Sequence, residues 1–124
     1  MDAVNKWKEI LKTRSISELD KIIAEKSVFY SPVIFKPQVG KYIVIKYLSA
    51  AITVFKESNF EYINEIKLND KAFLEFKCNL KNIEVNGIDY IEYDFKKIYL
   101  FKVFIRPQKA LNQLWLDMSN QLSL

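Results

Sequence analysis

The 124-residue sequence contains no histidine and only one cysteine, Cys78. The lack of histidine excludes Ser-His-Asp and Cys-His catalytic systems and any histidine-based metal site. A single cysteine forms no internal disulfide and no thiolate zinc site, which is typical of a protein from a reducing compartment. We interpret Cys78 as a small core residue rather than a nucleophile.

Long apolar runs are also missing. The most apolar stretch, residues 42–55, is interrupted by Lys46, and a membrane span needs about 20 apolar residues. The N-terminus resembles a charged amphipathic helix rather than a secretory signal. From these two features we expect a cytoplasmic protein with no membrane segment. There is no phosphate loop or dinucleotide-binding motif either, so we also expect no cofactor.

The charged residues do not gather in one part of the chain. The net charge is +4, but lysines and acids alternate along the whole sequence. Proteins that bind nucleic acid usually carry a basic stripe or patch. We therefore expect a mixed solvated surface and no nucleic-acid partner.

The first half of the chain has mainly helical periodicity. Val4, Trp7, Ile10 and Leu11 recur at the spacing of one helix face, and Ser17 begins a sequence close to a capping box. This half predicts, in order, a helix at 2–13, a short helix from Ser17 to about Ala24, a short strand at 28–30, a loop at 33–39 and a helix at 41–55.

The second half alternates with a period of two, which is typical of strands with one polar and one apolar face. It predicts strands at 60–68, 72–80, 83–95 and 98–105, turns at 69–70 and 81–82, and a closing helix at 108–122. Helices followed by an antiparallel meander indicate an α+β fold with the helices on one side of the sheet. The length fits a single domain at 1–124.

Glycine is scarce, so Gly87 is informative. The pair Asn86-Gly87 is ordinarily a strong hairpin signal. A turn there would leave a very short third strand. We therefore predict a bulge or sharp bend at Gly87 that curves the sheet.

Asp89 is the residue that departs from the pattern. It lies at an alternating position of the third strand, in register with Val85, Ile91 and Tyr93. A carboxylate on a core-facing surface is costly unless it is paired, hydrogen-bonded or protonated. Asp89 is therefore a candidate functional group. The alternative is that a backbone or tyrosine donor satisfies it, or that a bulge turns it outward.

Several degenerate segments, in this order and spacing, resemble the SnoaL-like branch of the nuclear transport factor 2-like superfamily. They are SELDKIIAEKSVFYSPV, the helix that begins at Gly40-Lys41, the LEF strand, VNGIDYIEYD and KIYLFKVFIRPQKAL. The resemblance implies a cone-shaped α+β barrel, in which a curved, mostly antiparallel sheet wraps N-terminal helices and a C-terminal helix follows. It also implies an apolar pocket and, often, a homodimer through the sheet.

Members of this superfamily include ketosteroid isomerases, polyketide cyclases, dehydratases, epoxide hydrolases and non-catalytic domains. Ketosteroid isomerases use a carboxylate base just before a proline, and a tyrosine and a protonated aspartic acid as oxyanion hole. Asp89 matches that aspartic acid by resemblance. Ser31 precedes Pro32 where the base would stand, and Trp7 replaces the tyrosine. A serine without a partner base does not abstract protons at useful rates.

Three hypotheses follow for function. The first is a binder of a small apolar molecule, with Asp89 as the polar contact. The second is an isomerase or cyclase that uses Asp89 as acid or base. The third is a homodimeric interaction module whose pocket is filled by its own side chains. We expect the pocket to be lined by Trp7, Tyr30, Leu74, Phe76, Tyr93, Phe101 and Ile105.

Overall fold

The structure is a computed structural model that describes residues 1–123. Its elements follow the order that the sequence predicts, with helices before the strand meander. They are α1 (Ala3–Thr13), the 3₁₀ helix η1 (Ile16–Lys21), β1 (Ile23–Tyr30), β2 (Gln38–Val39), α2 (Lys41–Phe55), β3 (Glu61–Lys67), β4 (Lys71–Leu80), β5 (Ile83–Tyr93), β6 (Ile98–Arg106) and α3 (Gln108–Leu122).

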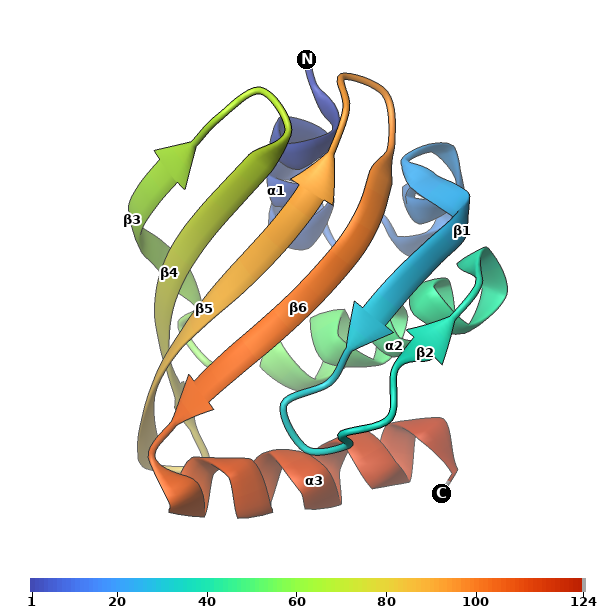
Figure 1. The fold of residues 1–124 in the computed structure, drawn as a ribbon. Helices are drawn as coiled ribbons and strands as arrows, with labels where there is room; N and C mark the ends of the chain where they lie inside the picture. Colours follow the sequence, from blue (N-terminus) through green and yellow to red (C-terminus); the bar gives the residue numbers. More distant parts are fainter. Residues whose placement is uncertain (124) are drawn as a thin grey trace.

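The six strands form one mixed sheet in the order β2-β1-β6-β5-β4-β3. All neighbouring strands are antiparallel except β1 and β6, which are parallel. Figure 1 shows α1 and α2 on one face of the sheet and α3 across its end. The predicted α+β fold with a mostly antiparallel sheet is confirmed, and the sheet is open, with β2 and β3 at its edges.

Helix α1 begins and ends with recognisable caps. The Asp2 side chain accepts a hydrogen bond from the Asn5 backbone N–H at 2.8 Å, and Arg14 closes the helix in the left-handed region with φ 60°. A carboxylate at this position satisfies an amide that the helix leaves unpaired. The helix buries Val4, Trp7 and Ile10, as their spacing predicts.

The region between α1 and α2 differs from the prediction. The expected helix to Ala24 is only the 3₁₀ turn η1, and β1 begins at Ile23 rather than at residue 28. Strand β1 has a register shift between Ile23 and Val28 where it pairs with β6. The shift breaks strict alternation, so the early part of this strand has no period-two signal in the sequence.

Gly87 lies in a continuously paired strand, which makes the predicted bulge wrong. It pairs with Phe76 on one side and Ile105 on the other without a register shift. A Cβ at this position would lie 2.3 Å from Phe76 Cζ and 2.6 Å from the Phe104 carbonyl oxygen. Glycine is therefore required because an aromatic ring lies directly over the backbone.

Strand β5 ends at Tyr93, two residues earlier than predicted. Asp94 Oδ1 accepts hydrogen bonds from the backbone N–H groups of Lys96 and Lys97, each at 2.8 Å. These bonds stabilise a turn in place of further strand pairing. Phe95 is consequently exposed in the turn instead of continuing the apolar face of the strand.

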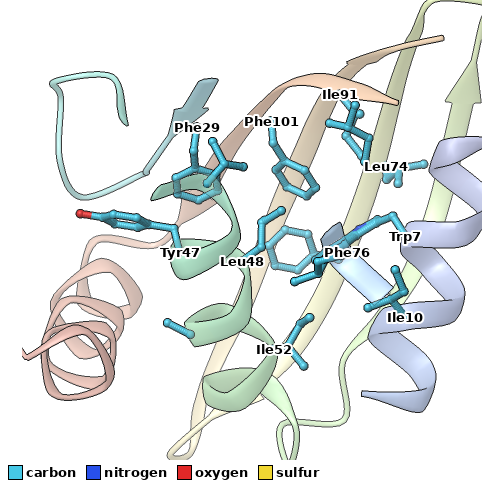
Figure 2. Close-up of a cluster of buried hydrophobic side chains, with 14 of the residues drawn as sticks. Trp7, Ile10, Phe29, Tyr47, Leu48, Ile52, Leu74, Phe76, Ile91 and Phe101 are labelled. Carbon is cyan, nitrogen blue, oxygen red and sulfur yellow. The ribbon is translucent and has the colours of Figure 1, made fainter. Parts of the chain in front are cut away.

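The main core lies between the helices and the inner face of the sheet. Figure 2 shows Trp7 and Ile10 of α1 and Leu48 and Ile52 of α2 converging on Phe76 of the sheet. The Trp7 ring meets Phe101 edge-on at a centroid distance of 5.0 Å. Aromatic rings thus fill much of the space that a cone-shaped fold encloses.

Within residues 1–123, no helix combines the length and the apolarity that crossing a bilayer requires.

Candidate functional site

Asp89 lies on the inner face of the sheet, in a central strand. Its neighbours across the sheet are Leu74 on β4 and Val103 on β6. The residue is only 5 % exposed. The alternation of β5 therefore turns a carboxyl group into the core, and the alternative in which a bulge turns it outward is wrong.

A chain of two hydrogen bonds ends at this carboxyl group. Trp7 Nε1–H donates to the Tyr62 hydroxyl oxygen at 2.9 Å, and the Tyr62 hydroxyl donates to Asp89 Oδ2 at 2.5 Å. Indole nitrogen can only donate and an ionised carboxylate can only accept, so Tyr62 accepts from Trp7 and donates to ionised Asp89. The direction of the chain is therefore fixed from α1 through β3 to β5.

The two oxygens of Asp89 have different surroundings. Oδ2 accepts from Tyr62, whereas the hydrogen bonds among residues 1–123 include none to Oδ1. Oδ1 is not one of the fully enclosed atoms that lack a partner. When the carboxyl group is protonated and Tyr62 still donates to Oδ2, the proton sits on Oδ1. Oδ1–H is then a hydrogen-bond donor with no protein acceptor.

Burial governs the titration of this site. Loss of solvation raises the pKa of Asp89 from 3.8 to about 7, and the hydrogen bond from Tyr62 partly opposes the rise. Burial, together with the adjacent Asp89, also holds the pKa of Tyr62 well above its ordinary value. A carboxyl group with such a pKa exists in both protonation states near neutrality, which suits either hydrogen-bond donation or proton transfer.

A small apolar cavity lies against Asp89. Its volume is about 40 Å³. That is room for water, but it is far below the roughly 300 Å³ of a typical small-molecule site. The cavity is lined by Trp7, Leu11, Leu48, Ala51, Phe55, Phe60, Phe76, Asp89, Phe101 and Val103.

An open cleft of about 400 Å³ lies outside this cavity, between the C-terminal ends of α1 and α2 and the start of β3. Leu11, Phe55 and Phe60 line both spaces. Tyr62 lines the cleft, while its hydroxyl group reaches Asp89 on the cavity wall. Three side chains therefore separate solvent in the cleft from the buried carboxyl group.

The structure brings together only part of the predicted pocket lining. Trp7, Phe76 and Phe101 line the cavity with Asp89, whereas Leu74 is fully buried in the core beside it. The remaining three lie elsewhere, because the sheet is wide and its inner face is divided by the helices. Tyr30 and Ile105 line a different surface cleft near Pro32, and Tyr93 donates to the Leu68 carbonyl oxygen at the end of the sheet.

Tyr62 is the tyrosine donor for Asp89, an alternative that the sequence left open, although the alternation of its strand grouped it with Ile66 on one face. In β3 the pairing with β4 shifts between Tyr62 and Asn64, so that Tyr62 faces Phe76 while Ile66 faces Phe73. The shift puts Tyr62 on the inner face and leaves Ile66 61 % exposed. In a strictly alternating strand these two residues would share a face.

Among residues 1–123, no three acidic, cysteine or histidine side chains cluster in a way that could hold a metal ion.

No protein-family model matches the chain, and no curated protein sequence matches it. Several solved structures match the chain. A steroid delta-isomerase from Pseudomonas aeruginosa superposes with a TM-score of 0.91 at 29 % identity, over 98 % of this chain and 89 % of that one. A protein from Silicibacter pomeroyi described as having a cystatin-like fold gives 0.87 at 25 % identity, over 96 % and 84 %.

A third structure, from Shewanella putrefaciens and described as a SnoaL-like polyketide cyclase, gives a TM-score of 0.68 at 12 % identity, over 92 % of this chain and 84 % of that one. Other matching structures are described as nuclear transport factor 2-like proteins of unknown function. The fold of this chain is that of the nuclear transport factor 2-like proteins. The resemblance inferred from the sequence is thereby confirmed, and the matched structures include a steroid delta-isomerase and SnoaL-like proteins.

Proposed function

We propose that this nuclear transport factor 2-like protein binds a small apolar molecule that bears a carbonyl oxygen, with Asp89 Oδ1 as the group that meets this oxygen. The observation that carries the proposal is a buried carboxyl group with one oxygen held by Tyr62 and the other without a protein partner, on the wall of an apolar cavity. A carboxyl oxygen that has no protein partner beside a cavity can form a hydrogen bond with a ligand there.

The ligand would extend from the cavity into the open cleft. The cavity alone is too small for a ring system, but Phe55, Phe60 and Leu11 form the partition between cavity and cleft. Phe60 stacks on Phe76 at a centroid distance of 4.7 Å, and Phe55 contacts both rings. Rotation of Phe55 and Phe60 would join the two spaces.

A matched pair of ligands tests this proposal. 2-Acetylnaphthalene carries a carbonyl oxygen, and 2-ethylnaphthalene has the same shape without it. At pH 6, where Asp89 is mostly protonated, we expect the ketone to bind up to about tenfold tighter, the effect of one net hydrogen bond. The advantage should disappear in Asp89→Leu. Equal affinities in the parent protein would contradict the proposal.

Nuclear magnetic resonance gives the location of binding. The two indole N–H signals come from Trp7, which is buried beside the cavity, and Trp115, which is exposed on α3. The ketone should shift the Trp7 signal and leave the Trp115 signal unchanged. A shift confined to Trp115 would place binding at the surface and exclude this cavity.

An isomerase or cyclase is a second candidate. It is favoured by the pKa of Asp89, which burial raises to about 7, and by the 29 % identity to a steroid delta-isomerase. Ser31 weakens it, since the hydroxyl group of this serine accepts from the Val33 backbone N–H at 3.1 Å and lies at the cleft near Pro32. Ser31 therefore supplies no base beside Asp89, whose titratable neighbour is the Tyr62 hydroxyl group.

Turnover separates the two candidates. A Δ5-3-ketosteroid that is converted to its conjugated isomer gains ultraviolet absorbance, which makes the assay direct. We expect no rate above that of buffer because the base is missing. Conversion that is lost in Asp89→Asn would establish the enzyme instead of the binder.

We further propose a homodimer through the outer face of the sheet. The exposed side chains of Ile66, Phe73, Ile88 and Phe104 lie on adjacent strands, and a contiguous apolar face of this kind marks an interaction site. Ile88→Glu should shift the protein to monomer in sedimentation. The control Phe95→Glu alters an exposed aromatic ring in the β5–β6 turn and should not. A parent protein that is already monomeric would contradict this proposal.

A further inference from the structure

The rim of the cleft outside the Asp89 cavity is strongly charged, and its charges are unbalanced. Four cationic and two anionic side chains line the cleft together with an apolar floor, so that the rim is net positive. The cations are Lys8, Lys12, Arg14 and Lys56, and the anions are Glu57 and Glu61.

Of the two carboxylates that line the cleft, Glu61 is paired with a lysine outside it, and Glu57 has no ion pair among residues 1–123. Lys8 Nζ lies 2.7 Å from Glu65, and Glu61 lies 3.5 Å from Lys77 Nζ. Neither Lys12 nor Lys56 has a carboxylate within ion-pair distance among residues 1–123, and both are exposed. Two ammonium groups at the mouth of the cleft are therefore available to an anion.

Arg14 links the end of α1, which carries Lys12, to Lys56 at the end of α2. It is the cap of α1, and its Nη2 donates to the Lys56 backbone carbonyl oxygen at the end of α2. The bond joins the end of the helix that carries Lys12 to the residue that follows Phe55. The cationic rim is thus connected to one of the rings that separate the cleft from the cavity.

The floor beneath these cations is apolar. It consists of Leu11, Ile52, Phe55, Phe60 and the Tyr62 ring, and it continues into the cavity wall through Leu11, Phe55 and Phe60. Moving inward, a ligand would meet cations first, then aromatic rings, and then the Asp89 carboxyl group. This order of surfaces fits a molecule with an anionic group at one end and an apolar body beyond it.

We propose that the ligand of this chain is an amphipathic organic anion, whose carboxylate or phosphate group lies between Lys12 and Lys56 while its apolar, carbonyl-bearing end reaches towards Asp89. The inference rests on the proposed binding function and specifies its ligand class. Cations near helix C-termini also offset the helix dipole. A role limited to that would affect stability and not the choice of ligand.

Three naphthalenes test the inference. 2-Acetylnaphthalene is the neutral ligand, 6-acetyl-2-naphthoate adds a carboxylate at the far end, and 6-acetyl-2-naphthyl phosphate adds a phosphate. We expect at least one anion to bind about fivefold to tenfold tighter than the neutral ketone, as two exposed ion pairs allow. The preferred anion identifies the group. Added salt should reduce this advantage.

Variants assign the effect to the rim. Lys12→Gln combined with Lys56→Gln should abolish the preference for the anion and change the affinity for the neutral ketone less than about twofold. Lys26→Gln combined with Lys109→Gln removes the same charge from exposed sites outside the cleft. This control should bind like the parent protein.

The outcomes distinguish the two proposals. If the neutral ketone binds but neither anion binds more tightly, the inference is wrong and the binding proposal stands. If the rim variant loses only thermal stability and keeps the preference, the lysines serve the helix ends and the inference is also wrong. If no naphthalene shifts the Trp7 indole signal, both proposals fail.

Discussion

Replacing Asp89 by asparagine should stabilise the protein at pH 8 and have little such effect at pH 4. Burial raises the pKa of Asp89 to about 7 from 3.8. Between these values the unfolded chain has released the proton while the folded chain still holds it. Folding is therefore most favoured below the lower value, and the contribution of this group is lost as the pH rises through the higher one.

The magnitude follows from the size of the shift. About three pH units correspond to on the order of 4 kcal/mol, since one unit is worth about 1.4 kcal/mol. Asparagine has nearly the same shape, can accept from Tyr62 and does not ionise. The free energy of unfolding of Asp89→Asn, less that of the parent protein, should therefore increase by that amount between pH 4 and pH 8.

Urea unfolding at steps across this range measures the difference directly. Any constant cost of the new amide group cancels, because only the trend with pH matters. Asp20→Asn, which removes an exposed carboxylate, should show no comparable trend. A difference for Asp89→Asn that is flat with pH would refute the assignment of a buried, late-titrating carboxyl group.

Three further predictions concern single residues of the site. Tyr62→Phe removes the hydrogen bond that lowers the pKa of Asp89, so the carboxyl carbon signal should titrate at higher pH than in the parent protein; an unchanged midpoint would mean that the bond is weak. Gly87→Ala should cost about 1–3 kcal/mol in urea unfolding, because the new Cβ overlaps the Phe76 ring and the Phe104 carbonyl oxygen; a neutral result would show that both the ring and the neighbouring strand give way freely. Burial raises the pKa of Cys78 to about 11, so a thiol reagent at pH 8 should label the native protein far more slowly than the unfolded one; similar rates would contradict a closed core.

The sequence predicted the elements with strong periodicity or clear end signals. The helices at 41–55 and 108–122 agree with α2 and α3, since each has a sharp beginning at Gly40 or Pro107. The turn at 81–82 is confirmed by two consecutive residues with positive φ, Lys81 and Asn82. Local chemistry of this kind needs no tertiary information.

The predictions that failed concern segments whose structure depends on partners far away in the sequence. The first part of β1 is a strand because it pairs with β6, although Leu19, Ile22 and Ile23 have helical spacing. Gly87 is needed because of the Phe76 ring, which lies on another strand. A pattern along the chain cannot report either contact, and tertiary pairing overrides local preference at both places.

The residues of the candidate site were likewise predictable only where their own strand carried the signal. Asp89 was found from its own strand, because one carboxyl group among apolar neighbours breaks a regular alternation. A tyrosine donor was one of the expected alternatives, but the sequence did not identify which tyrosine, because the register shift in β3 reverses the face on which Tyr62 lies. A regular hairpin about residues 69–70 would place Tyr62 opposite Lys77, on the outer face, instead of opposite Phe76.

The register shift in β3 affects both the polar contact in the cavity and the exposed apolar face of the sheet. Without it, the buried carboxyl group of Asp89 would lack the hydroxyl partner that holds Oδ2, and the Trp7 indole would lack its acceptor. With it, the inner half of β3 supplies the site while the outer half presents Ile66 beside Phe73 on the exposed face. One irregular position in an edge strand thus fixes the polarity of the cavity and adds an apolar residue to the face proposed for dimerisation. Ile63 is the extra residue at the shift, so its deletion would make the pairing regular and keep Tyr62 opposite Phe76 and Ile66 opposite Phe73. We therefore expect the Trp7 indole signal and the sedimentation coefficient of the deletion variant to match those of the parent protein. A displaced Trp7 signal would show that the extra residue itself, and not the register alone, positions Tyr62.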